Sequence, residues 1–221
     1  MTTPAITGPA LRRCAELAEL DDTDLGATFL GRQQMHAHRP AELQRRWARI
    51  ALAAGRTAAQ DAAVAPTMDR AADPAGWAAD AGLTVVSARA GLRPGWVVVA
   101  EYVQRRHEVR IHEDVLELAE RLVDRLGWRE WYPAGALRSA AIAHELGHRA
   151  VHRDAARELR TSLGLCTLRL GRYRRYGHVS GTPELFAHGY AQQTCALGRS
   201  PLLLTFALAA AARARTGKDA G

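Results

Sequence analysis

Residues 144–148 form the pentapeptide His-Glu-Leu-Gly-His, whose residue types and spacing could carry out hydrolysis. On a helix, His144 and His148 project side by side, so both imidazoles can reach one metal ion about 2.0–2.1 Å away. Glu145 points beside such an ion rather than at it. A Zn²⁺ ion with an open position lowers the pKa of its bound water to about 7, and Glu145 could accept a proton as that water attacks a carbonyl. The spacing favours this zinc site over two metal-free histidines packed on a helix.

A catalytic zinc site needs a third protein ligand. His152 continues the series by one turn, but the helical rise places it about 12 Å from His144, too far to share an ion. Asp154 could be a ligand only if the chain turned sharply back after His148. Val151 disfavours the left-handed backbone that such a turn requires. Asp154 therefore stays an alternative to a ligand from further along the chain.

Glu184 is the preferred third ligand. It falls in the first turn of a predicted helix in which Thr182 is the N-cap and Pro183 the first helical residue. Ala187 and Ala191 lie on nearly the same face, and their small size would let this helix approach the histidine-bearing helix closely. An acidic residue in the first turn also complements the helix dipole, so a purely structural role for Glu184 remains open.

Peptide cleavage also requires a group that stabilises the developing oxyanion. We select His178 as the catalytic candidate for this role, with Tyr176 and Tyr190 as alternatives, although a packing or surface position is the more common one for each of the three. His188 lies one turn after Glu184, where it could hydrogen-bond a metal ligand, although an ordinary position on the helix surface is favoured.

Length and composition are those of a folded protein rather than a disordered or fibrous one. The chain has 221 residues, of which 48% are hydrophobic, enough for the core of one domain with a helical appendage. Its three cysteines are far apart and no signal peptide is visible, which predicts a cytoplasmic location. The longest apolar run, residues 202–212, is far shorter than the roughly 20 residues that cross a bilayer, so we expect no membrane association.

The net charge is positive. Lys and Arg number 30 against 23 Asp and Glu, giving +7 and a pI near 10.0. This balance allows attraction to nucleic acid or to an acidic protein without requiring either. Arginines and tyrosines alternate in residues 169–176, which could bind phosphates or an acidic substrate segment, or form a solvated surface.

Hydrophobic periodicity indicates the elements that must position these residues. Apolar residues three and four apart predict two or three helices between residues 10 and 65, followed by a proline-containing boundary over 62–76. A short helix over 74–81 comes next. The period then changes to two, which predicts three strands, over 83–87, 96–102 and 108–112. Either of the last two strands could pair with an extended substrate chain.

Helical periodicity returns after the strands. It predicts a helix over 115–126 that Gly127 ends, and a helix that opens at Pro133 and carries both histidines of the pentapeptide on its buried face. Further helices are expected over 155–170 and from Pro183 onward.

These elements predict an α+β fold. We expect a helical N-terminal region over 1–68, a catalytic domain over 69–200, and a C-terminal helix and tail over 201–221. In the catalytic domain, a three-stranded antiparallel sheet would pack on the histidine-bearing helix.

The order of three strands, a helix with the HELGH sequence, and a later helix with Glu-x-x-Ala-x-x-Tyr-Ala resembles the ImmA/IrrE-type zinc metallopeptidases, a minimal branch of the gluzincins. The resemblance covers about residues 74–197. It implies a small zincin-like fold, a zinc ion held by His144, His148 and Glu184, and Glu145 as general base. It also implies cleavage of a partner protein, often a transcriptional repressor.

Two classes of function follow. The first is a zinc-dependent endopeptidase that cleaves a specific intracellular protein, such as a transcriptional regulator. The second is a zinc-stabilised, non-catalytic module that binds nucleic acid or a regulatory partner. A Glu145→Gln substitution separates them, because it should remove proteolysis and leave zinc bound.

Overall fold

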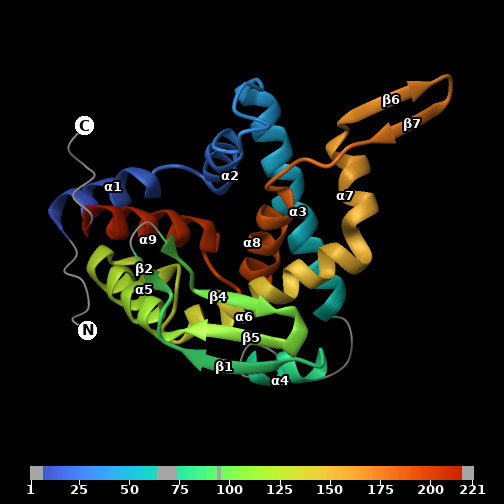
Figure 1. The fold of residues 1–221 in the computed structure, drawn as a ribbon. Helices are drawn as coiled ribbons and strands as arrows, with labels where there is room; N and C mark the ends of the chain where they lie inside the picture. The colour runs from blue at the N-terminus through green and yellow to red at the C-terminus, as the bar shows by residue number, and fades with distance from the viewer. Residues whose placement is uncertain (1–6, 64–73, 94–95, 216–221) are drawn as a thin grey trace.

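The computed structural model describes residues 7–63, 74–93 and 96–215 (Figure 1). The described part is a helical body with a small sheet on one side and a two-stranded hairpin that projects from the opposite end. The α+β class expected from the sequence is confirmed. Among the described helices, none combines the length and the apolar character that a membrane span requires.

Three helices occupy the N-terminal part, as predicted. They are α1 (Gly8–Ala18), α2 (Asp22–Gly31) and α3 (Ala41–Ala63). The side chain of Thr7 accepts a hydrogen bond from a backbone N–H of the first turn of α1, and the side chain of Asp21 does so for α2. These caps satisfy backbone donors that have no partner within the helix, which fixes where the two helices begin.

The main sheet has the strand order β1-β5-β4 and is mixed rather than antiparallel. Its strands are β1 (Thr84–Ala88), β4 (Ala100–Val103) and β5 (Glu108–His112). β4 and β5 pair antiparallel, whereas β1 pairs with β5 in parallel. The expectation of three antiparallel strands is therefore wrong for β1.

The connections explain the mixed pairing. A single turn of 3₁₀-helix, η1 (Gln104–Arg106), joins β4 to β5, and such a tight turn forces antiparallel pairing. The connection from β1 to β5 is long and includes a separate hairpin of β2 (Leu92–Arg93) and β3 (Trp96–Val97). The predicted strand over 96–102 is thus split between β3 and β4.

The helix after the sheet matches its prediction. α5 spans Glu113–Leu126 and buries its apolar stripe, and Gly127 ends it with a left-handed backbone at φ 69°. The 3₁₀ turn η2 (Trp128–Glu130) follows. The next helix, α6 (Ala136–Ala150), begins after Pro133 rather than at it.

The helix α8 spans Thr182–Thr194 and packs directly against α6. Gly147 of α6 is the point of closest approach, because a Cβ atom built there would lie 2.9 Å from the Cα atom of Ala187. Ala191 packs near Ala143 of α6 in a small cluster under α4 (Pro74–Asp80). The predicted close approach through small residues is confirmed.

α3 supports α8 from the other side. A Cβ atom at Gly55 of α3 would lie 2.0 Å from the carbonyl oxygen of Phe186, and one at Gly189 of α8 would lie 2.2 Å from the carbonyl oxygen of Leu52. Both distances are too short for any side chain, so the two glycines set the spacing of these helices. The helix α8, which carries Glu184, is therefore held between α6 and α3 (Figure 1).

Helices from all three predicted regions share one hydrophobic core. α1 packs along α9 (Pro201–Arg215), while α3 packs on α8. The expected boundary at 68/69 lies outside the described residues, and the expected boundary at 200/201 coincides with the start of α9.

The predicted helix over 155–170 is wrong in its second half. A π-helical turn, η3 (Val151–Ala155), continues α6 into α7 (Ala156–Leu163), which ends where Gly164 adopts φ 70°. The chain then forms the antiparallel strands β6 (Cys166–Leu170) and β7 (Tyr173–Tyr176). Gly171, with φ 56°, occupies the first position of the two-residue turn between them, where glycine is favoured.

Candidate metal centre

Three predicted ligands converge between α6 and α8. The Nε2 atom of His144 lies 3.1 Å from one carboxylate oxygen of Glu184, and the Nε2 atom of His148 lies 3.1 Å from the other. The two Nε2 atoms are themselves 3.1 Å apart. One turn of α6 therefore presents two imidazole nitrogens to a carboxylate from the first turn of α8, which begins one residue earlier than predicted, with Gly181 rather than Thr182 as its N-cap.

The donor spacing fits a small divalent cation. Ligands placed tetrahedrally about 2.0–2.1 Å from zinc lie about 3.3–3.4 Å from one another. The three separations of 3.1 Å are close to that value. Two imidazoles and one carboxylate are also a ligand set of catalytic zinc sites. His144, His148 and Glu184 can therefore hold such an ion with little rearrangement.

The surroundings of Glu184 keep its carboxylate ionised, as a metal ligand must be. Burial alone would raise the pKa of Glu184, but the hydrogen bonds of His144 and His148, together with the charge of His144, hold it well below its usual range. Burial would lower the pKa of His144, yet the hydrogen bond and charge of Glu184 outweigh it, so the net change is upward. The carboxylate is thus ionised at any pH near neutrality.

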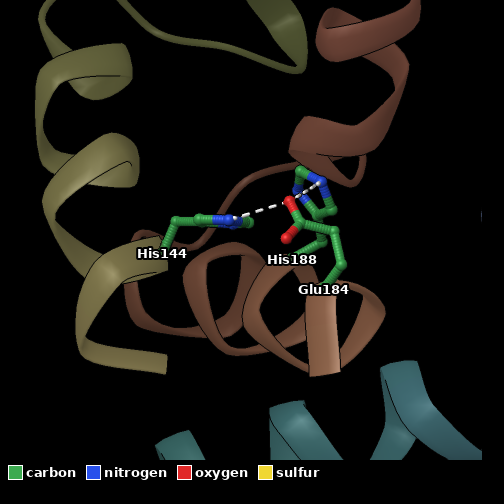
Figure 2. A group of neighbouring side chains, drawn as sticks. All are labelled: His144, Glu184 and His188. Atoms are coloured by element: carbon green, nitrogen blue, oxygen red, sulfur yellow. Dashed lines mark ion pairs between the residues drawn. The ribbon is translucent and has the colours of Figure 1, made fainter. Parts of the chain in front are cut away.

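His188 belongs to the same cluster (Figure 2). Its side chain, on α8 one turn after Glu184, is only 3% exposed, its ring lies 4.5 Å from that of His144, and its Nε2 atom lies 3.6 Å from Glu184. Burial, and then the charge of His144, lower the pKa of His188 to about 3, so the ring is neutral near pH 7. The surface position that the sequence left open for His188 is wrong.

A second ligand set is therefore present in the described residues. Donor atoms of His144, Glu184 and His188 lie within 4.8 Å of one another. We favour His148 as the second imidazole ligand, because its Nε2 atom lies 3.1 Å from donor atoms of both His144 and Glu184. His188 is then a neutral ring packed beside the centre. The four-residue spacing from Glu184 indicated that His188 lies close to Glu184 on the helix. The burial of the His188 side chain depends on tertiary packing, which the spacing does not reveal.

Glu145 occupies the position expected of a proton acceptor. Its side chain is 8% exposed and lines the same cavity as the donors. Burial raises the pKa of Glu145; the charges of His144 and His148 act against this, and those of Glu184 and Glu101 add to it. A carboxylate with a raised pKa is a better proton acceptor than an ordinary one.

The cluster opens on a cavity of about 280 Å³. Its remaining walls are almost entirely apolar and come from the β3–β4 segment and from α5, α6 and α9. The apolar and hydroxyl-bearing residues that line it are Val97, Val98, Val99, Ala100, Leu116, Ala119, Leu137, Ala140, Ala141, Leu197, Pro201, Leu204, Thr205 and Leu208. The polar donors thus share one pocket with mostly apolar side chains.

Other candidates lie elsewhere. His178 is exposed, lies close enough to His36 to influence its charge, and is not among the residues that line the cavity. Tyr190 is half-buried beside Gly147 rather than in the cavity wall. The backbone of Asp154 continues α6 in the π-helical turn instead of turning back, while its side chain lies outside the described residues.

Comparisons of the chain with protein-family models, with curated proteins and with solved structures gave no match. The resemblance to the ImmA/IrrE-type peptidases, and with it the zincin-like fold, stays a prediction that depends on the motifs alone.

Proposed function

We propose that the protein is a zinc-dependent peptidase that hydrolyses peptide bonds of a protein substrate. One observation carries the proposal: two imidazole nitrogens of α6 and the carboxylate of Glu184 converge at zinc-ligand spacing beside a buried glutamate. A structural zinc site would have no need of Glu145, which lines the same cavity but is not among the residues whose donor atoms cluster.

The residues divide the chemistry between them. His144, His148 and Glu184 would hold zinc, which supplies Lewis-acid activation of water and of the scissile carbonyl. Glu145 would accept the proton of the attacking water at a carboxylate oxygen and pass it to the leaving amine. The raised pKa of Glu145 suits both steps, because the same group must act first as base and then as acid.

The sheet suggests how a peptide would be bound. Both sides of β5 are occupied by neighbouring strands, whereas β4 forms an edge of the sheet as far as the chain is described. Ala100 of β4 also lines the cavity that contains the donors. An extended segment of the substrate would pair with β4 and so lie across the metal centre. The substrate class that the motif resemblance suggests is an intracellular transcriptional regulator.

Two variants and one control test this proposal. Purified protein, Glu184→Gln, Glu145→Gln and the exposed control Glu42→Gln would be equilibrated with Zn²⁺, analysed for metal content, and incubated with a peptide library read by mass spectrometry. We expect about one zinc per chain in all but Glu184→Gln, and cleavage only by the wild type and the control. A chain that binds no zinc overturns the proposal. Cleavage by Glu145→Gln at the wild-type rate overturns the assigned mechanism and the proposed peptidase with it.

A further inference from the structure

The hairpin formed by β6 and β7 projects from the body of the molecule at the end of α7 (Figure 1). Every residue of β6 and all but the last of β7 are exposed. A two-stranded hairpin of this kind has marginal stability in water when nothing covers it. Its surface chemistry therefore indicates what it binds.

The two faces of the hairpin differ. Residues paired across the strands share a face, and Arg169 pairs with Arg174, so two arginines stand directly opposite each other on one face. The pair Leu170 and Tyr173 and the pair Leu168 and Arg175 share the other face. The side chain of Leu170 is 64% exposed, and those of Leu168 and Tyr173 are exposed as well.

The positive charge on the hairpin has no internal compensation. Residues 164–183 contain four arginines and no Asp or Glu. Within the described ranges no ion pair joins Arg169, Arg172, Arg174 or Arg175 to an acidic side chain. Like charges placed directly opposite across two strands repel each other. A polyanion that accepts hydrogen bonds on both strands would remove this repulsion.

We propose that the β6–β7 hairpin is a binding arm for double-stranded DNA. The major groove of B-form DNA is about 12 Å wide and admits a two-stranded ribbon, whereas the major groove of A-form RNA is deep and too narrow for side chains to read. Arginines occur on β6, on the turn and on β7, so both edges of an inserted ribbon would meet phosphates. Tyr173 and the two leucines would contact base edges and thymine methyl groups.

The charge distribution also argues against a second copy of the chain as the occupant, since two such hairpins would repel each other. The net charge of +7 adds long-range attraction to DNA. The inference is independent of the proposed peptidase activity, because no hairpin residue lines the cavity of the metal centre.

The test measures binding of the full chain to a fluorescent 20-base-pair DNA duplex by anisotropy over a range of salt concentrations. The variant is Arg169→Gln/Arg174→Gln. Its matched control is Arg105→Gln/Arg106→Gln, which removes the same charge from the exposed turn η1. A third variant, Arg169→Lys/Arg174→Lys, keeps the charge on the hairpin. Circular dichroism checks that each variant is folded.

We expect the hairpin variant to bind roughly tenfold or more weakly at about 0.1 M salt, with a salt dependence reduced by about two counterions, while the control and the lysine variant bind nearly as wild type. The inference is overturned if the wild type does not bind the duplex at low salt, or if the control loses as much affinity as the hairpin variant. The inference is also overturned if poly-glutamate, an RNA duplex or anionic lipid vesicles bind as tightly as the DNA duplex or more tightly. The hairpin would then bind a different polyanion.

Discussion

The Nε2 atoms of His144 and His148 lie 3.1 Å apart, and each faces a different oxygen of Glu184. Two nitrogens one helical turn apart can be this close only when both rings turn toward a common point. The carboxylate of Glu184 lies at that point because α8 approaches α6 at Gly147. Several measurable consequences follow from this arrangement and from the packing around it.

Zinc should stabilise the folded chain through this centre. A ligand that binds only the folded state at 100 times its dissociation constant adds about 2.7 kcal/mol. We expect the melting temperature of the wild type to rise with added Zn²⁺ and that of Glu184→Gln to stay constant, as measured by differential scanning fluorimetry. Glu42→Gln serves as control and should respond as the wild type does. If added Zn²⁺ raised the melting temperature of Glu184→Gln by the same amount, the ion would bind at a different site.

Gly147→Ala should loosen the metal centre. The added Cβ atom would lie 2.9 Å from the backbone of Ala187, so α6 and α8 must move apart at a cost of about 1–3 kcal/mol, partly offset by the better helix propensity of alanine. Chemical denaturation and zinc titration should both report a loss. At Gly8, an added Cβ atom would approach only the guanidinium of Arg12, at 3.7 Å, so Gly8→Ala should leave zinc affinity unchanged.

The apolar cavity should select the substrate side chain that it receives. Ala140 lines the cavity one turn before His144, and Ala140→Leu would fill part of the space without removing a donor. We expect zinc content to be retained and cleavage of peptides with large apolar side chains to fall, with a smaller effect on peptides with small ones. Leu204→Ala should shift the preference the opposite way. Uniform effects on all peptides would show that this cavity does not receive substrate.

The three free thiols should differ sharply in reactivity. Cys166 lies exposed on β6, whereas burial raises the pKa of Cys14 to about 11 and that of Cys195 to about 12. Since the thiolate is the reactive form, iodoacetamide at pH 8 should modify Cys166 within minutes and the other two only after unfolding. Mass spectrometry of the modified peptides measures this order. Rapid modification of Cys195 in the native protein would contradict its packing against the cluster of Trp77, Ala143 and Ala191.

Glu113 should make stability depend on pH in a defined direction. A hydrogen bond from Ser87, opposed by partial burial and reinforced by Arg138, lowers the pKa of Glu113 and links β1, α5 and α6. A lowered folded-state pKa stabilises the protein above the unfolded value of about 4.3, and this contribution is lost as the pH falls through the folded-state pKa. Glu113→Gln should therefore be less stable than wild type at pH 7, by about 1 kcal/mol or less. The difference should shrink toward pH 3 in urea titrations.

Local sequence patterns predicted most of the helices and strands and the three residues that converge at the candidate metal centre. The four-residue spacing of His144 and His148 depends only on neighbouring residues, and both histidines lie on one helix, as predicted. The end of α5 at Gly127, in a left-handed backbone conformation, was also predicted from local sequence. The small residues around Glu184 even predicted which helices approach closely.

Features that depend on distant contacts could not be predicted in this way. The parallel pairing of β1 with β5 follows from a long connection whose path no local pattern encodes. The alternation of Leu168, Arg169 and Leu170 fits a strand. The expected helix over 155–170 extends the helical period of the preceding residues across it, whereas in the structure the helix α7 ends before Gly164. The burial of His188 and the exposure of His178 are likewise set by the packing of whole helices and loops.

The contact of Gly55 with Phe186 joins the first third of the chain to its last third, directly behind the helix that carries Glu184. During synthesis on the ribosome, the pentapeptide with its two histidines emerges well before Glu184 does. A nascent chain therefore lacks the carboxylate and the backing that α3 gives to it. The three donors can therefore come together only after Glu184 has been synthesised and α8 has packed against α6 and α3.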